Sequence, residues 1–315
     1  MFQKLLTQLF LFFLRIGVVF APREEYEHKI SEIQPLSEKT AIYDTAVWEY
    51  RSVTSESTGN TYWYYTTKND AGGQPLVCIH GLLLDGRTFT NLAEFMPGKR
   101  LVALNLLQQS DLYTGAINDY VIMVTDFLRT LEIHSCSLFG FSFGGVVALR
   151  MVAHAPDDIS FERCILAATI LPGATREARK NSRRTNKWIK GFKDYQLYWF
   201  IEKVTKFSAK NYGKDKRDAF EKMLAVKQPN WYRQVSASVA DYNALDDASS
   251  VACPVLILHA EKDVFLDRKM RSIMKTVFPN VRYRTITNST HTMVFTMPEI
   301  IARHINEFTE DASGE

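Results

Sequence analysis

The sequence predicts an α/β protein with a mostly parallel β-sheet that helices cover on both faces. From residue 46 to residue 168, short apolar runs typical of buried strands alternate with helical stretches, and strands return at residue 254. Alternation of this kind indicates a parallel sheet between two layers of helices. The chain has 315 residues, of which 46% are hydrophobic and 23% charged. It is therefore long enough for one sizeable core with an insertion, and its composition excludes a disordered scaffold.

The expected elements follow one another in a regular order. The first two strands, 46–56 and 60–68, flank the turn Ser57-Thr58-Gly59. Later strands are expected at 75–79, 101–104, 135–139, 254–258 and 281–286, and helices at 87–96, 116–131, 145–155 and 298–308. Between residues 172 and 247 the strand pattern stops, and a polar, aromatic segment that is compatible with helices intervenes.

A serine lies between two glycines directly after one of the expected strands, in Gly140-Phe141-Ser142-Phe143-Gly144. In a strand-to-helix turn, Gly-x-Ser-x-Gly is the nucleophile elbow, which projects the serine hydroxyl from the sheet. The positive end of the following helix favours negative charge beside Ser142. Taken by itself, the pattern could also be a glycine-rich turn with no catalytic role. The presence or absence of a base and an acid elsewhere in the chain must distinguish the two interpretations.

A serine nucleophile needs a base and an acid that orients the base. Asp263 follows the expected strand 254–258, where a turn would present a carboxylate. His291 lies in the loop between the strand 281–286 and the last helix. We therefore expect Asp263 as the acid and His291 as the base, with Glu261 as the competing acid.

Acyl transfer to a serine also needs hydrogen-bond donors for the oxyanion, and these are usually two backbone amides. The expected strand 75–79 ends in His80-Gly81-Leu82, and Phe143 follows the serine. We assign the two donors to the amides of Leu82 and Phe143. His80 is expected to support this loop and not to act as a base.

Together these motifs resemble the α/β-hydrolase superfamily, in its cap-bearing group of lipases and esterases. The resemblance covers about residues 46–308 and implies an α/β-hydrolase fold with a core of residues 40–171 and 248–310. It implies a helical cap at 172–247, inserted after the sixth strand, and the family spacing favours Asp263 over Glu261. The chain departs from the family at Asn105, where many relatives carry Asp, and at Ser289-Thr290 before His291, where relatives often carry glycine.

The predicted cap is strongly basic. Between residues 176 and 233 there are 17 Lys and Arg against 6 Asp and Glu, a net charge of +11, whereas the whole chain is +3. This asymmetry suggests an anionic partner, either a membrane surface or an acidic acyl carrier. The alternative is a solvated helical surface with no partner. No nucleic-acid-binding motif accompanies the charge, so nucleic acid is not expected as a partner.

Residues 1–22 form a second unusual segment, because the stretch from 5 to 20 is nearly all apolar. The polar residues in and before it fall largely on one arc, as in a helix that lies in a membrane interface. Arg15 and the short length argue against a full span. Two alternatives stay open, a signal or signal-anchor and a helix packed on the protein itself. We expect a cytoplasmic protein, peripherally bound to a membrane through this segment.

The remaining chemistry is expected to be simple. The four cysteines, Cys78, Cys136, Cys164 and Cys253, lie in or beside expected strands, which favours core thiols over disulfides. No metal site and no cofactor are expected. The expected function is a serine hydrolase that cleaves a hydrophobic, lipid-like carboxylic ester through an acyl-enzyme. Thioester hydrolysis, acyl transfer, carbon–carbon bond hydrolysis and slow-turnover binding are the alternatives, since one fold hosts many functions.

Overall fold

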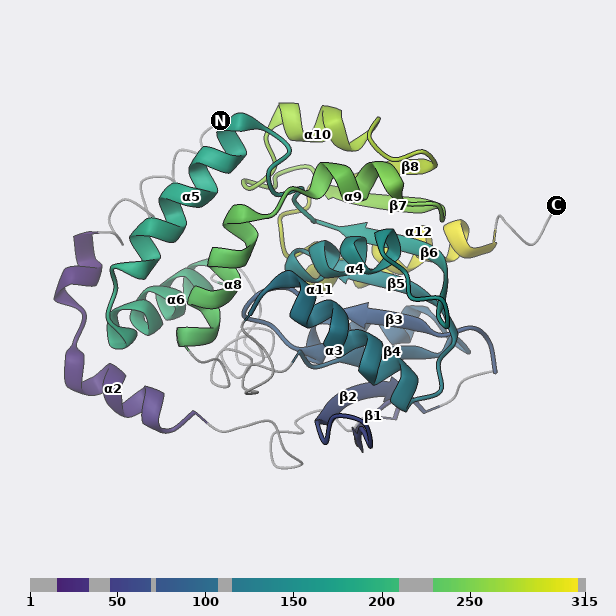
Figure 1. The fold of residues 1–315 in the computed structure, drawn as a ribbon, viewed down its shortest axis with the longest axis horizontal. Helices are drawn as coiled ribbons and strands as arrows, with labels where there is room; N and C mark the ends of the chain where they lie inside the picture. The colour runs from purple at the N-terminus through teal and green to yellow at the C-terminus, as the bar shows by residue number, and fades with distance from the viewer. Residues whose placement is uncertain (1–15, 34–45, 69–71, 107–114, 210–228, 311–315) are drawn as a thin grey trace.

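A computed structural model describes residues 16–33, 46–68, 72–106, 115–209 and 229–310 (Figure 1). Its centre is an eight-stranded sheet in the order β1-β2-β4-β3-β5-β6-β7-β8. β2 pairs antiparallel with β1 and with β4, and all other neighbours are parallel. The predicted α/β architecture with a mostly parallel sheet is confirmed. The strands are β1 (Trp48–Thr54), β2 (Thr61–Thr67), β3 (Leu76–Ile79), β4 (Leu101–Leu104), β5 (Ser135–Phe141), β6 (Ser160–Ala167), β7 (Val255–Ala260) and β8 (Val281–Ile286).

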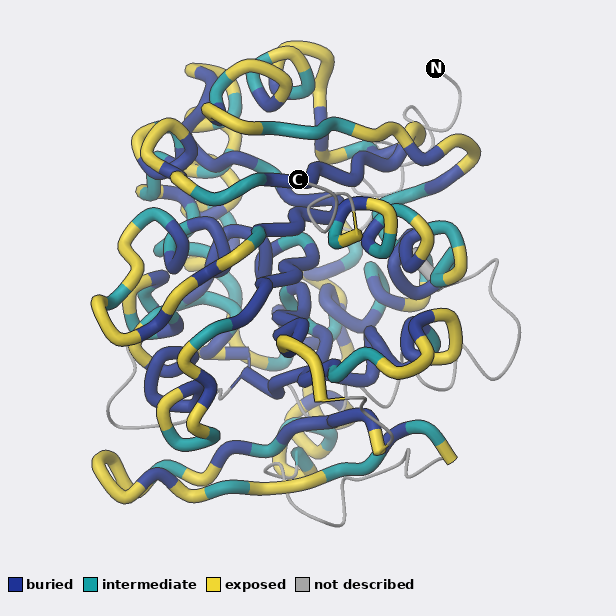
Figure 2. The backbone as a smooth tube through the Cα atoms, turned by 90° about the vertical axis from the view of Figure 1, so that its right-hand side faces the viewer, coloured by how far each residue is buried: buried dark blue, intermediate teal, exposed yellow. Residues whose placement is uncertain are grey.

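The central strands are buried on both faces, because successive side chains of a strand point to opposite sides of the sheet. On β3, Val77 and Ile79 belong to one apolar cluster, and Leu76 and Cys78 belong to the other. Figure 2 shows the buried residues concentrated in the centre of the molecule. The near-continuous apolar strands of the sequence thus result from a sheet with two covered faces.

Helices cover both faces. The first cluster includes residues of α3 (Ile117–Thr130), α4 (Phe143–Ala153), α9 (Ala244–Ser250) and α10 (Arg268–Met274). The second includes residues of the 3-10 segment η3 (Gly86–Phe95), α11 (Met293–Thr296) and α12 (Pro298–Glu310). The helical stretch that we predicted at 87–96 corresponds to η3, which is a 3-10 helix. In its first turns, the Thr88 and Thr90 hydroxyls donate to carbonyls three residues earlier, at 2.8 Å each.

The described residues between β6 and β7 form α5 (Arg176–Lys190), α6 (Asp194–Ala209), α8 (Pro229–Asp241) and α9. In Figure 1, α5, α6 and α8 gather to the left of the sheet. Part of the segment that we predicted as a cap, 210–228, lies outside the described residues. Ile189, Leu197 and Ile201 form a small core between α5 and α6, and Leu83 of the loop after β3 packs against it. The helices predicted as a cap therefore contact the loop that carries Leu82.

Residues 17–31 lie against α6. After η1 (Val18–Phe20), Pro22 precedes α2 (Arg23–Ser31), a helix that we did not predict. Tyr26 is buried and donates its hydroxyl to the carboxylate of Glu202 on α6, and Lys29 Nζ lies 3.3 Å from the same carboxylate. We call these contacts of Tyr26 and Lys29 with Glu202, together with the Lys206 Nζ contact at 2.5 Å, the Glu202 joint.

Most of the predicted N-terminal segment, residues 1–15, lies outside the described residues. Within the described ranges, no helix combines the length and the apolar character that a membrane span requires.

Candidate active site

Ser142 occupies the sharp turn between β5 and α4, with φ 52° and ψ −115°. Non-glycine residues rarely adopt positive φ, and such strain persists only where the surroundings impose it. The surroundings here are backbone atoms in very close contact. A Cβ on Gly144 would lie 2.0 Å from the carbonyl oxygen of Ile79, and Ser142 N donates to Ala167 O at 2.9 Å. Only glycine at position 144 lets α4 begin this close to β3, and the turn leaves Ser142 partly exposed.

The structure brings the three predicted catalytic residues together. His291 Nε2 lies 2.9 Å from Ser142 Oγ, and His291 Nδ1 lies 2.8 Å from Asp263 Oδ2. The Asp263 side chain is fully buried, and that of His291 is 23% exposed. A carboxylate at Nδ1 fixes the tautomer that carries the proton there, so that Nε2 accepts from the serine hydroxyl. The competing acid Glu261 is exposed and instead accepts from the amide of Asn288 at 2.7 Å.

Phe265 is a residue of this site that we did not single out in the sequence. Its ring centroid lies 4.7 Å from that of the His291 imidazole, and the ring centroid of Phe141 lies 5.6 Å from the same imidazole. The Phe265 amide donates to Asp263 Oδ1 at 2.9 Å, which leaves Oδ2 for His291. The Phe265 side chain is nevertheless 60% exposed. The sequence feature that could have indicated its role is a large apolar residue two positions after the expected acid.

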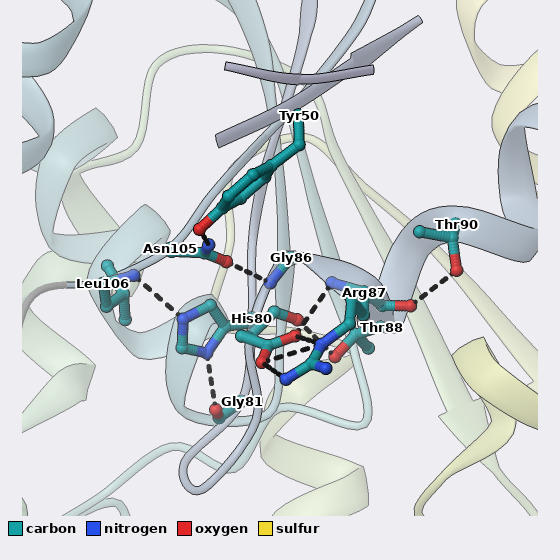
Figure 3. A network of polar contacts seen from close by, with 10 residues as sticks. Tyr50, His80, Gly81, Gly86, Arg87, Thr88, Thr90, Asn105 and Leu106 are labelled. Carbon is teal, nitrogen blue, oxygen red and sulfur yellow. Dashed lines mark hydrogen bonds and ion pairs between the residues drawn. The ribbon is translucent and has the colours of Figure 1, made fainter. Parts of the chain in front are cut away.

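His80 holds the loop after β3 (Figure 3). Its ring is buried, Nδ1 lies 2.8 Å from the carbonyl oxygen of Gly81, and Nε2 lies 3.0 Å from the amide nitrogen of Leu106. Since the Leu106 amide can only donate, Nε2 accepts, and the ring proton on Nδ1 donates to Gly81. In a trans peptide the N–H points opposite to the C=O, so this bond turns the Leu82 N–H away from His80. This arrangement agrees with the expected supporting role of His80.

Asn105, where many relatives carry Asp, also fixes this region (Figure 3). Its Oδ1 accepts from the Gly86 amide at 2.7 Å, and its Nδ2 lies 3.4 Å from the Tyr50 hydroxyl. Next to it, Asp85 and Arg87 form a buried ion pair, with Nη2 and Oδ2 2.5 Å apart. The amide oxygen does the accepting here that a carboxylate could also do, so the departure leaves the loop intact.

Of the two predicted oxyanion donors, Phe143 directly follows the serine in the sequence, and Leu82 lies in the loop after β3. Within the described ranges, the amides of Leu82 and Phe143 form no hydrogen bond to protein atoms. Leu83, directly after Leu82, has φ 67°. This left-handed conformation is energetically unfavourable for leucine. A Cβ on Gly81 would lie 3.3 Å from the Ser142 Cβ, so the loop runs directly beside the nucleophile.

His259, at the end of β7, is a buried histidine close to the site. Within the described structure, neither ring nitrogen has a hydrogen-bond partner, and burial lowers the pKa of His259 to about 4, with the charge of Arg271 adding to the effect. The four cysteines are free thiols, and burial raises the pKa of Cys78 and Cys136. The described residues contain no cluster of three or more His, Cys, Asp or Glu side chains suited to a metal ion.

Comparison with known proteins identifies the family. The model of the alpha/beta hydrolase family matches residues 76–304, a range that includes Leu82, Ser142, Asp263 and His291. The chain belongs to the alpha/beta hydrolase family. The predicted resemblance and the α/β-hydrolase fold are thereby confirmed.

Individual relatives are distant. The AB hydrolase superfamily protein YisY of Bacillus subtilis is 23% identical over 257 residues, which are 75% of this chain and 92% of YisY. An esterase from Exiguobacterium antarcticum superposes with a TM-score of 0.69 at 16% identity, over 83% of this chain and 100% of the esterase. A membrane phospholipase A, described as a bacterial virulence factor, superposes with a TM-score of 0.68 at 18% identity over 100% of both chains. At these identities the structural likeness shows the fold alone.

Proposed function

We propose that the protein is a serine hydrolase that cleaves a carboxylic ester of a hydrophobic, lipid-like substrate. The observation that carries the proposal is the continuous chain of contacts from Asp263 through His291 to Ser142, at 2.8 and 2.9 Å. These distances are within the range for proton transfer between a nucleophile and its base. The buried carboxylate fixes the orientation of the imidazole.

In the proposed reaction, His291 accepts the proton of Ser142 as Oγ attacks the ester carbonyl. The amides of Leu82 and Phe143 donate to the oxyanion, and the N-terminus of α4 adds favourable charge. His291 then donates the proton to the leaving alcohol. Water, deprotonated by the same imidazole, hydrolyses the acyl-enzyme and restores the free serine. Asp263 stabilises the imidazolium that forms in each half of the reaction.

The surroundings of the serine favour an apolar substrate. Leu82 and Leu83 are only partly buried beside it, and the exposed ring of Phe265 adjoins the base. A peptide or a sugar would leave polar groups unpaired against these side chains, whereas an acyl chain would not. The likeness over the full chain to a membrane phospholipase A supports a lipid ester as the substrate class.

The same residues could serve thioester hydrolysis, acyl transfer or carbon–carbon bond hydrolysis, because the fold hosts all of these. None of them is favoured by a specific contact. A binding protein that keeps the three residues but turns over slowly is the non-enzymatic alternative. Covalent labelling with little turnover on any ester would distinguish it.

The deciding experiment is hydrolysis of p-nitrophenyl esters of increasing chain length, with fluorophosphonate labelling in parallel. We expect turnover with an optimum at a medium or long acyl chain. Ser142→Ala should lose labelling and at least about 10⁴-fold in kcat. Ser135→Ala, at the other end of β5, is the matched control and should retain both. An unlabelled wild-type protein with an intact thermal transition would refute the proposed function.

A further inference from the structure

Exposed apolar side chains concentrate at η1. Among the described residues, six large hydrophobic side chains are exposed, and three of them are Ile16 at 50%, Val19 at 66% and Phe20 at 79%. The other three, Phe95, Ile122 and Phe265, are spread over η3, α3 and the loop after β7. Single exposed apolar residues are normal on a soluble protein, but three within five positions mark an interaction surface.

η1 is fixed to the helices predicted as a cap. Val18 is buried with Phe200 of α6, and two aromatic residues pack against this pair: Trp188 near the C-terminal end of α5 and Phe192 just after that helix. Gln196 Nε2 donates to Val18 O at 3.3 Å, and the Glu202 joint binds α2 to α6. The exposed side chains of η1 therefore project from a segment that is held on both sides and lies beside the C-terminal end of α5.

α5 presents a basic stripe to solvent. Seven of its fifteen residues are Lys or Arg, all seven are exposed, and Glu177 is its one acidic residue. At 3.6 residues per turn they fall within an arc of about 140°. They are Arg176, Arg179, Lys180, Arg183, Arg184, Lys187 and Lys190. Within the described ranges, Arg183 is the one member that pairs with a carboxylate, Asp241 at 3.6 Å. The stripe thus carries a large positive charge that the protein leaves mostly uncompensated.

We infer that η1 and the basic stripe of α5 form one docking surface for an anionic lipid bilayer. Val19 and Phe20 enter the region between headgroups and acyl chains, while the α5 cations bind the headgroup phosphates. Apolar side chains next to a row of Lys and Arg are the combination that binds such membranes, because burial and attraction to anionic lipid add. Self-association through η1 would bring the two basic helices of a dimer near each other, which disfavours a second copy as the occupant.

The inference extends beyond the proposed function, because docking does not need the reaction. Vesicle binding is therefore measured on the full chain by co-sedimentation, also in the Ser142→Ala background. Vesicles of phosphatidylcholine alone are compared with vesicles that contain phosphatidylglycerol as well. The protein should bind the anionic vesicles far more strongly. Ser142→Ala should bind as the wild type does, so that failure of the chemistry and failure of docking are separable.

Two pairs of substitutions separate the contributions to docking. Arg184→Gln with Lys187→Gln should weaken binding to anionic vesicles about 30-fold, which is about 1 kcal/mol for each charge near the surface. Arg268→Gln with Lys269→Gln, on exposed positions of α10, is the matched control and should change it little. Val19→Ser with Phe20→Ser should weaken binding to both kinds of vesicle, and Ile122→Ser on α3 is its control. Thermal transitions verify that each variant is folded.

Each remaining outcome overturns the inference. Wild-type binding that is equal for both kinds of vesicle would remove the role of the stripe. Binding that survives both pairs of substitutions would remove this surface altogether. A change from dimer to monomer in Val19→Ser with Phe20→Ser, without a change in vesicle binding, would make η1 a contact between copies. Tight binding of an acidic acyl carrier by a protein that ignores vesicles would assign the stripe to that partner.

Discussion

The turn around Ser142 and the Glu202 joint both fix one segment against another, but by different means. At the turn, backbone lies against backbone, and a single added Cβ would come within 2.0 Å of a carbonyl oxygen. At the joint, Tyr26, Lys29 and Lys206 converge on one carboxylate. The packing at the turn involves no titratable group and depends only on the close approach of backbone atoms. The joint depends on charge, so it responds to pH and to nearby charged surfaces.

Glu202 shows how such a joint works. Burial opposes its charge, but the hydrogen bonds from Lys206 and Tyr26 and the charges of Lys206 and Lys29 outweigh this and lower the pKa of Glu202 to about 2. A carboxylate with a depressed pKa stabilises the folded state fully above the pKa of the unfolded chain, near 4.3. That stabilisation is lost as the pH falls from there to about 2. The joint is therefore closed at neutral pH and weakens in acid.

The largest effect is expected at the candidate active site next to the Ser142 turn. Asp263→Asn should lower kcat about 10⁴-fold while the fold persists, because the amide no longer holds the required tautomer of His291. Steady-state hydrolysis of a p-nitrophenyl ester measures the loss. Glu261→Gln is the matched control, expected to stay within about twofold. The reverse result would move the acid role to Glu261.

Gly144→Ala tests the backbone packing at the turn. The new Cβ would meet the Ile79 carbonyl, so α4 and β3 must separate, and the free energy of unfolding should fall by about 3 kcal/mol. Urea unfolding gives the number. Gly73→Ala, where a Cβ would have no neighbour within 4 Å, is the control and should change it little. An unaffected Gly144→Ala would mean that the close approach is not required.

Glu202→Gln tests the joint and should have a smaller effect. Losing the charged hydrogen bonds should lower the free energy of unfolding at pH 7 by about 2 kcal/mol. The difference from wild type should shrink at pH 3, because the wild-type protein loses the same stabilisation there. Glu27→Gln, in the exposed pair with Arg23, is the control and should change the free energy of unfolding little. A difference that stays constant between pH 7 and pH 3 would argue against the charged joint.

The smallest effect is expected at His259. Since the folded protein excludes a proton that the unfolded chain accepts, wild-type stability should fall as the pH drops from about 6.5 to about 4. His259→Leu should remove this part of the pH dependence. It should also raise the free energy of unfolding at pH 7 by about 1 kcal/mol, since two unpaired buried nitrogens disappear. Thermal unfolding across this pH range measures both, and a steeper pH dependence in the variant would contradict the account.

The contrast also explains what could be predicted from the sequence. Local patterns predict the strands, the turn at Ser142 and the positions of Asp263 and His291. Apolar runs and the residues at strand ends can be recognised from a few neighbouring positions. The contact of Tyr26 with Glu202 joins residues 176 positions apart, and neither has a distinctive neighbourhood. Phe265 and the short helices α10 and α11 likewise depend on tertiary packing. The 3-10 geometry of η3 also cannot be read from the periodicity of its apolar residues.

Leu83 connects the two regions, and this matters for exchanging parts between relatives. Its backbone has a positive φ directly after Leu82, while its side chain packs on the core of Ile189, Leu197 and Ile201. The helices after β6 thus contact the loop that carries Leu82, one of the two proposed oxyanion donors. A chimera that receives these helices from another hydrolase should change turnover as well as substrate preference, unless the donor's residues 80–84 are transferred with them.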